Sequence, residues 1–440
     1  MADLCIDFEW LSCPDKDPLE EATTARLEIY IDDFCLTRNV NTFTKTIENS
    51  VNVSLYPLAM WLVSSWWRLH YEILPADLRM GPGHNWRLSH EMSAANSGFV
   101  WPNLVMAPDW EEIQIWAQPT QEQDHSVFYL NGLNDSRIVP KKDFTLAVSS
   151  FVDEVVTRLN DSGLQDTDLS QIWSLIKEEQ RDSTTNLYRL LEAQLGYDPG
   201  ECPDKLIGQA VTLEKKLGSS FSELSGAYAK GDEDRIQQIY ALTELEGITG
   251  KPDMPQFVFQ KSEGKPWQLA VHTANELRCK MGMPDGNLSN ENLFHLLGLT
   301  KEKYESWMPI EKARAAVAER GGNGSLKLIP RKSHPVSRRF ELARFIGDYL
   351  RLLEYDSDEW LVSADLSTSR QKFQRAFAAE LLCPIKSLVE FMDDDFSESA
   401  IESAVSLFDV SEKTIESQLM NNGYMLPAAN RSGIPYKLAF

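Results

Sequence analysis

The sequence predicts a multidomain α+β fold. Three observations favour it. A chain of 440 residues is too long for one ordinary core. Near Phe144 the apolar period changes from strand-like to helical, and past residue 255 helices and short strands mix. Eight of the twelve tryptophans fall in the first block. We therefore expect a Trp-rich α+β domain (1–143), a helical region (144–255) and a mostly helical domain with a small sheet (256–440).

The first block contains several strand-like runs and one long helix. Turn residues or charges flank the runs, which are ARLEIYID, FVWPNLVMAP, EEIQIWAQP and HSVFYLNG. Between the first two, residues 54–71 repeat apolar side chains at three- and four-residue steps. This spacing predicts one helix buried on a sheet.

The tryptophans mark the first block as the recognition part of the molecule. Most of them should belong to the core, but tryptophan is also the residue most enriched in binding hot spots. Trp86, Trp101 and Trp110 lie in the less periodic segments. We expect some of the tryptophans, Trp86, Trp101 or Trp110, to be partly exposed, and these three are the candidates for contact with a protein partner.

Charge and cysteine usage limit the environment and the partners. The formal net charge of −23 disfavours nonspecific binding to nucleic acid or anionic lipid. It favours a basic protein partner, or it serves solubility alone. Six scattered cysteines without a CxxC pair indicate reduced thiols, and the acidic start MADLCIDFEW differs from a signal peptide. The longest suspicious apolar run, residues 55–67, is too short to span a membrane. We expect a cytoplasmic protein.

Amphipathic periodicity predicts the helices of the middle region and of the last block. Between residues 144 and 248 the chain has five amphipathic segments, several with Asp, Ser or Thr as caps. The last block adds short strand-like runs, QFVFQ, GSLKLIPRK and EWLVSAD, to its helices.

Two helical motifs and a helical tail follow one another in the last block. RRFELARFIGD begins at Arg338, AFAAELLCP ends at Pro384, and a helical tail covers residues 404–423. The block resembles the ImmA/IrrE family of metallopeptidase-like proteins over about 170 residues. The resemblance implies a zincin-like fold with a helix that normally carries H-E-x-x-H, two zinc ligands and a general base.

The residues that perform zinc chemistry are replaced at every position the resemblance assigns. Arg344 and Asp348 stand at the two His positions, and Phe345 stands at the general-base Glu. The third ligand, a Glu in the family, falls near Gln371 or Phe373, and neither is a carboxylate. Guanidinium does not ligate zinc and a phenyl ring accepts no proton. We expect no bound metal, no cofactor and no peptidase activity. His90 begins HEMSA, but Ala94 replaces its second His.

Two arrangements fit the altered site. In the first, Arg344 and Asp348, four apart on one helical face, form an ion pair while Phe345 fills the former cavity. In the second, Arg344 forms an anion pocket with Arg339, Arg370 or Arg375.

The pattern of the helical tail is typical of a helix-turn-helix: a first helix, a turn near Asp409, a cap at Ser411 and a second helix. Residues 387–412 carry eight acidic side chains and no basic one. A DNA reader needs basic residues there, so we expect this pair to pack on the core and not to bind DNA.

These observations favour a non-catalytic regulator, adaptor or effector subunit that binds a protein partner. The resemblance implies a bacterial mobile-element, toxin–antitoxin or phage-defence setting. Two alternatives remain: a metallopeptidase with an unorthodox site, and an acidic nucleic-acid mimic that occupies a DNA-binding protein.

Overall fold

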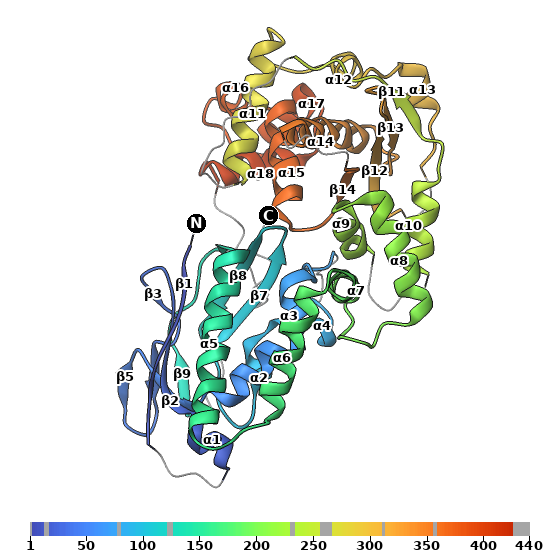
Figure 1. The fold of residues 1–440 in the computed structure, drawn as a ribbon. Helices are drawn as coiled ribbons and strands as arrows, with labels where there is room; N and C mark the ends of the chain where they lie inside the picture. Colours follow the sequence, from blue (N-terminus) through green and yellow to red (C-terminus); the bar gives the residue numbers. More distant parts are fainter. Residues whose placement is uncertain are drawn as a thin grey trace. The chain divides into compact units, whose positions relative to one another are not determined.

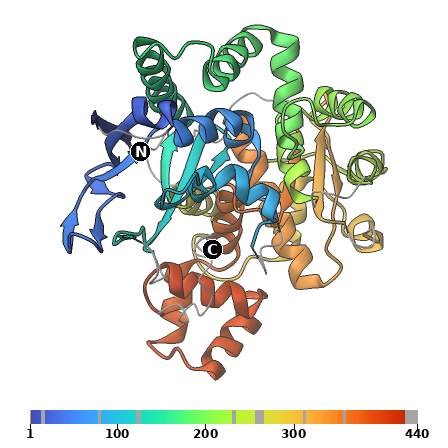
Figure 2. The same ribbon diagram turned by 90° about the horizontal axis from the view of Figure 1, so that it is seen from below.

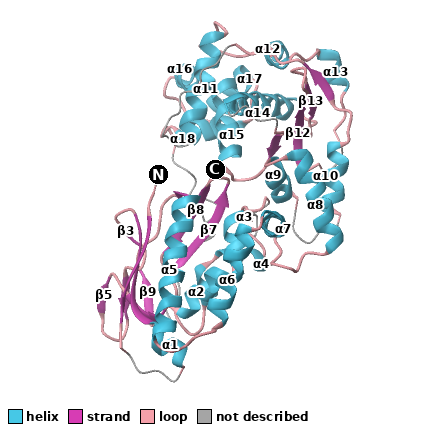
Figure 3. Ribbon diagram, in the orientation of Figure 1, coloured by secondary structure: helices cyan, strands magenta, loops and turns pink. Residues whose placement is uncertain are grey.

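The computed structural model describes residues 2–12, 17–76, 81–120, 126–228, 234–255, 266–309, 313–354 and 359–425. These residues form two compact units, an N-terminal unit up to Val211 and a C-terminal unit from Thr212 (Figure 1). Each unit combines helices with small antiparallel sheets (Figure 3), which confirms the predicted α+β multidomain class. Within the described ranges, every helix is too short or too polar to cross a bilayer.

The N-terminal unit contains three small sheets. Its strands are β1 (Leu4–Trp10), β2 (Thr24–Ile31), β3 (Phe34–Cys35), β4 (Asn39–Asn41), β5 (Thr46–Glu48), β6 (Val51–Ser54), β7 (Asn103–Asp109), β8 (Glu112–Gln118), β9 (Val127–Tyr129) and β10 (Arg137–Pro140). The sheets have the orders β1-β2-β3 with β6 also on β2, β5-β4-β9 and β10-β8-β7. The four strand-like runs of the first block correspond to β2, β7, β8 and β9.

Seven α-helices pack with these sheets. They are α1 (Pro18–Thr23), α2 (Tyr56–Ser64), α3 (Trp66–Tyr71), α4 (His84–His90), α5 (Lys141–Asp161), α6 (Asp168–Arg181) and α7 (Ser183–Gln194). The single helix expected over residues 54–71 is two helices, because Ser65 adopts φ −96° and ψ 3° between them. The apolar face predicted for that stretch is nevertheless buried in one core.

The boundary expected at residues 143 and 144 lies inside this core. Phe151 of α5 meets Phe8 of β1 edge to face at 5.7 Å, and Trp173 of α6 meets Trp66 of α3 at 4.9 Å. Amphipathic helices bury their apolar faces wherever a complementary surface exists. The sheets provide that surface for α5 and α6, so the division between the units falls later, within α8 (Asp204–Leu217).

A buried ionic cluster joins α3, α4 and β7. Glu72 Oε2 accepts a hydrogen bond from Arg68 Nε at 2.6 Å and lies 3.2 Å from His90 Nε2. The other ring nitrogen, His90 Nδ1, lies 2.7 Å from the carbonyl oxygen of Met106. Burial alone would raise the pKa of Glu72, but His90 and Arg68 outweigh it and lower that pKa.

We expect Glu72→Ala to lower the free energy of unfolding by about 3–5 kcal/mol at neutral pH, because the buried Arg68 and His90 lose their shared acceptor. The pKa of this carboxyl is depressed in the folded state. Its contribution is therefore present above the ordinary Glu value of about 4.3 and is lost as the pH falls through the lower folded value. Urea unfolding between pH 7 and pH 3 measures both effects. Glu154→Ala, on the exposed face of α5, is the control, and equal stability of the two variants would contradict the prediction.

The C-terminal unit is built around one four-stranded antiparallel sheet with the order β11-β13-β12-β14. Its strands are β11 (Ile248–Gly250), β12 (Ala315–Arg320), β13 (Leu326–Ile329) and β14 (Leu361–Ala364). Its helices after α8 are α9 (Ser220–Ala227), α10 (Arg235–Thr243), α11 (Pro266–Lys280), α12 (Asn290–Leu297), α13 (Lys301–Ser306), α14 (Pro335–Glu354), α15 (Ser369–Leu382), α16 (Ile385–Met392), α17 (Glu398–Phe408) and α18 (Glu412–Asn421). The runs GSLKLIPRK and EWLVSAD form β13 and β14, whereas QFVFQ lies outside the described residues.

Helices α14 and α15 lie against each other in the interior of this unit (Figure 1). A Cβ atom at Gly347 would lie 2.6 Å from Cδ1 of Phe377. Only glycine allows this approach, because real Cβ atoms do not come so near an aromatic carbon without displacing it. The two motifs quoted from the sequence thus form one packed pair.

The last three helices gather at one end of the C-terminal unit (Figure 2). Helix α17 ends at Phe408, the next residue Asp409 has φ +50°, and the Ser411 side chain caps α18. Apolar side chains of both helices are buried in the core of the unit, as the sequence predicts. They include Ile401, Ala404, Phe408, Ile415 and Leu419.

Candidate functional site

The three positions where the resemblance places metal ligands meet at the edge strand β14. In the part of the chain that the structure describes, β14 pairs with another strand, β12, on one side only. Hydrogen-bonding groups alternate along a strand, so the N–H and C=O groups of Val362 and Ala364 point away from β12. In an isolated sheet these groups would be open to an added strand.

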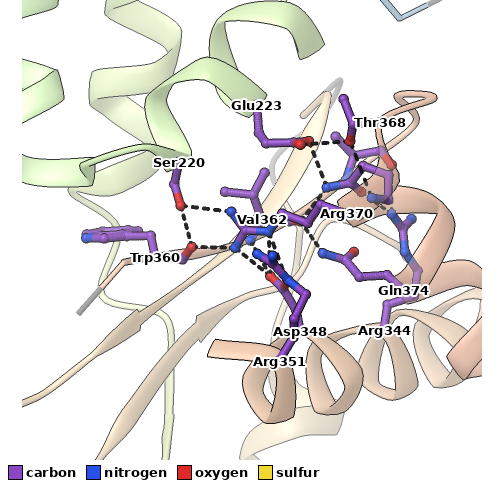
Figure 4. Close-up of polar contacts among 12 residues, drawn as sticks. Ser220, Glu223, Arg344, Asp348, Arg351, Trp360, Val362, Thr368, Arg370 and Gln374 are labelled. Atoms are coloured by element: carbon purple, nitrogen blue, oxygen red, sulfur yellow. Dashed lines mark hydrogen bonds and ion pairs between the residues drawn. The ribbon is translucent and has the colours of Figure 1, made fainter. Parts of the chain in front are cut away.

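Side chains occupy the outward groups of Val362 and the amide of Ala364 (Figure 4). The Val362 N–H donates to Asp348 Oδ2 at 3.2 Å, and the Val362 oxygen accepts from Gln371 Nε2 at 2.8 Å and Gln374 Nε2 at 2.9 Å. The Ala364 N–H donates to Gln371 Oε1 at 2.9 Å. The amide of Gln371 therefore makes the two bonds that one residue of a neighbouring strand would make.

The remaining outward oxygens are bound in the same way. Ser220 Oγ and Arg370 Nη2 donate to the Trp360 oxygen at 2.6 and 2.8 Å. Arg344 Nη2 donates to the Ala364 oxygen at 2.8 Å. Together with the bonds at Val362, these contacts satisfy the free edge of β14 along its length.

Helix α9 joins this network from a distant part of the sequence. Glu223 Oε2 accepts from Gln371 Nε2 at 3.0 Å, and Glu223 Oε1 accepts from Thr368 Oγ1 at 2.7 Å. The Ser220 contact with Trp360 links residues 140 positions apart. Sequence reasoning missed α9 because no local pattern indicates a contact at such a separation.

The ion pair expected between Arg344 and Asp348 is wrong. Asp348 is bound instead by Arg370, whose Nη2 lies 2.7 Å from Oδ2 and whose Nε lies 2.9 Å from Oδ1. Arg351 Nε approaches the same carboxylate at 3.5 Å. Arg370 offers two parallel donors, a stronger arrangement than a single contact along one helix. Burial would raise the pKa of Asp348, but Arg370 and Arg351 lower it.

Among the described residues, no carboxylate is hydrogen-bonded to the buried Arg344. Its Nη2 donates to the Ala364 oxygen and to Gln371 Oε1. Burial lowers the pKa of its guanidinium to about 9, and the charges of Arg375 and Arg331 act in the same direction. The neighbouring Phe345 is fully buried in the core, as the cavity-filling hypothesis predicts.

The four arginines of the expected anion pocket do not meet. Arg339 donates to Asn290 Oδ1 at 2.8 Å, near the start of α12. Arg370 is paired with Asp348 at the first half of β14. Arg344 and Arg375 lie at the other end, where Arg375 Nη1 donates to the Leu366 oxygen at 2.7 Å. Arg339 and Arg370 are thus held by other acceptors and do not join Arg344, whereas Arg344 and Arg375 bond to the same loop after β14.

The site therefore has guanidinium and amide donors and one ion-paired carboxylate. No imidazole belongs to it. Among the described residues, no group of three His, Cys, Asp or Glu side chains is placed to hold a metal ion. The arrangement binds backbone groups of its own edge strand, and its hydrogen-bonding capacity is directed inward.

Two of the three tryptophans proposed for partner contact, Trp86 and Trp101, are buried, so these two candidates are wrong. Trp86 is 2% exposed and stacks on His90 with ring centroids 4.1 Å apart. Trp101 is 3% exposed, and its indole N–H donates to the Asn96 oxygen at 3.0 Å. The less periodic segments that contain them pack into the core through these contacts.

Trp110 is the exposed member of the set, with 41% of its surface accessible. Asp109 pairs with Glu112, so Trp110 and Glu111 form the two-residue turn between β7 and β8. Trp110 adopts φ +61°, a region that favours glycine and is costly for a bulky residue. The Lys141 N–H donates to the Glu111 oxygen at 2.8 Å and fastens the turn to the start of α5.

No protein-family model, curated protein or solved structure matches this chain. The likeness to the ImmA/IrrE family, with the fold it implies for the C-terminal unit, stays a prediction from the motifs.

Gln371→Ala tests whether the β14 edge depends on this amide. We expect the free energy of unfolding to fall by about 2–4 kcal/mol, because the Ala364 N–H, Arg344 and Glu223 each lose a buried partner. Gln237→Ala, on the exposed face of α10, is the matched control and should change stability by less than about 0.5 kcal/mol. Chemical denaturation of the full chain measures the difference, and similar values for both variants would exclude the role given to Gln371.

Asp348→Asn should cost about 3–5 kcal/mol at pH 7, since Arg370 and Arg351 lose their buried counter-ion. The folded pKa of Asp348 is lowered, so its stabilisation exists above the ordinary Asp value of about 3.9 and disappears as the pH falls through the folded pKa. The gap between the wild type and the variant should therefore narrow in acid. Asp394→Asn, an exposed position, provides the baseline; a gap independent of pH would refute the charge pairing.

Proposed function

We propose that the chain is a non-catalytic, protein-binding regulator, adaptor or effector subunit. The resemblance to the ImmA/IrrE family suggests a bacterial mobile-element, toxin–antitoxin or phage-defence system as its setting. The proposal separates two roles, a closed scaffold in the C-terminal unit and partner binding by the N-terminal unit.

The saturated edge of β14 is the observation that carries the proposal. Peptide recognition by strand addition needs free N–H and C=O groups along an edge. Here Gln371, Asp348 and Arg344 hold those groups, and they are the same residues that stand at the positions of zinc ligands. A peptide would have to displace several buried, charge-assisted hydrogen bonds to reach the strand.

The turn at Trp110 supports partner binding by the N-terminal unit. Of the eight tryptophans in the first block, six are buried, Trp10 is half-buried and Trp110 is exposed. Backbone strain of this kind costs on the order of 1–3 kcal/mol and concentrates at functional sites. A large indole kept at a glycine-favouring position fits a role as an anchor in a partner's pocket.

The charges beside the turn indicate the chemistry of the partner. Glu111 is exposed next to Trp110, and Glu112 is half-exposed. Within a chain of net charge −23, these carboxylates favour a partner with a basic rim around an apolar pocket. Association should weaken with added salt.

Trp110→Gly tests the proposed anchor. We expect the variant to remain folded, with stability within about 1 kcal/mol of the wild type, because glycine relieves the positive φ while adding chain entropy. It should lose the partner that the full-length wild-type chain captures from the cells that express it. Affinity capture followed by mass spectrometry, with thermal unfolding of each variant, measures both properties.

Trp267→Gly is the matched control, since Trp267 is 39% exposed in the C-terminal unit. It should retain the partner. Retention by Trp110→Gly as well would exclude the turn as the anchor. Incubating the captured partner with the wild-type chain adds a second arm: zinc-dependent cleavage of the partner would favour the metallopeptidase alternative and overturn the proposal.

A further inference from the structure

Basic residues collect at one end of the sheet in the C-terminal unit. Strand β12 begins where β13 and β14 end, because Val317 pairs with Ile329 and Ala315 pairs with Ala364. Just beyond these strand ends lie Arg314, Arg331, Lys332 and Asp365. The antiparallel topology thus places three cations and one carboxylate together.

Two helices bring further guanidinium groups to the same loop. Arg344 of α14 donates to the Ala364 oxygen at 2.8 Å, and Arg375 of α15 donates to the Leu366 oxygen at 2.7 Å. At the same loop, Arg331 donates hydrogen bonds to both carboxylate oxygens of Asp365, from Nη2 to Oδ1 at 2.6 Å and from Nη1 to Oδ2 at 3.0 Å. Three consecutive residues, 364–366, therefore each receive one arginine.

The cations outnumber the carboxylates that face them. Glu341 lies 3.4 Å from Arg331 Nε, and its other oxygen accepts the backbone N–H groups of Arg331 and Lys332. Glu223 of α9 acts electrostatically on Arg375. Asp365 interacts electrostatically with Arg331, Lys332, Arg344 and Arg375, and Glu341 interacts with Arg331 and Arg344. Four cations of the described residues thus share Glu223, Glu341 and Asp365, in a chain of net charge −23.

The carboxylate of Asp365 lies where another anion could bind to Arg331 in its place. Its side chain is 65% exposed, whereas that of Arg331 beneath it is 5% exposed. Burial acts to raise the pKa of Asp365, but Arg331, Lys332 and Arg344 lower it to about 2. The buried Nε of Arg344 has no acceptor among the described residues. An exposed carboxylate can rotate into water without breaking the core, and its departure would open the guanidinium groups to another anion.

We propose that this end of the sheet binds a phosphate monoester, whose oxygens replace those of Asp365 on Arg331 and reach Arg344, with Arg314 and Lys332 at the entrance. Arginine binds phosphate through paired, charge-assisted hydrogen bonds, and a phosphate dianion brings more negative charge to these guanidinium groups than the carboxylate that it replaces. A free phosphorylated small molecule and a phosphorylated side chain of another protein share this chemistry. The site does not depend on the partner proposed for the N-terminal unit.

Isothermal titration of the full-length chain with inorganic phosphate at constant ionic strength tests the site. We expect saturable binding. Asp365→Asn should strengthen it about tenfold by removing the competing carboxylate. Arg314→Gln and Lys332→Gln, both near the surface, should each weaken it about two- to fivefold. Lys303→Gln removes the same charge from the exposed face of α13 and should leave binding unchanged.

A second arm separates the two sources of phosphate. A short peptide with one phosphoserine is titrated beside its unphosphorylated copy. Tighter binding of the phosphopeptide than of inorganic phosphate assigns the site to a phosphorylated chain, and equal binding assigns it to a small phosphorylated molecule. The proposal is overturned if phosphate shows no saturable binding, or if Arg314→Gln and Lys332→Gln change it no more than Lys303→Gln does.

Discussion

The C-terminal unit depends on the need to satisfy the outward backbone groups of β14. These groups are buried, and an unpaired buried amide or carbonyl costs about as much as a lost hydrogen bond. Helices α9, α14 and α15 each supply side chains to them, so the strand fixes where the three helices lie. Gln371 makes the central contact, because its amide has both the donor and the acceptor that the strand requires.

The same strand separates two electrostatic environments. At its start, Arg370 and Asp348 neutralise each other within hydrogen-bonding distance. At its end, Arg344 is buried beside further cations and its guanidinium has a lowered pKa. Two arginines in one network thus differ in role: Arg370 completes an ion pair, and Arg344 bonds to the Ala364 oxygen and Gln371 while Asp365 acts on it only electrostatically.

The sequence predicts periodic elements well and long-range partners poorly. The strands β2, β7, β8, β13 and β14 and the helix pair α17–α18 follow from local period and capping, which are properties of neighbouring residues. Asp348 could be placed on the same face as Arg344, but its actual partner, Arg370, belongs to another helix. Trp86 and Trp110 are similar in sequence context. Only the tertiary contacts show that one stacks on His90 and the other lies on a two-residue turn.

The side-chain hydrogen bonds of Gln371 also protect the unit against aggregation with other copies of itself. An open edge strand is a template for aggregation, and proteins usually protect it with charge, proline, a bulge or a covering element. Here a single glutamine amide, supported by neighbouring polar groups, performs that protection for β14. Ser220 of α9 is 140 residues away from its acceptor, the Trp360 oxygen, in the chain. Before α9 reaches the sheet during folding, that oxygen has Arg370 alone as donor and Gln371 lacks its bond to Glu223, so the protection of the edge against intermolecular strand pairing is weaker at that stage.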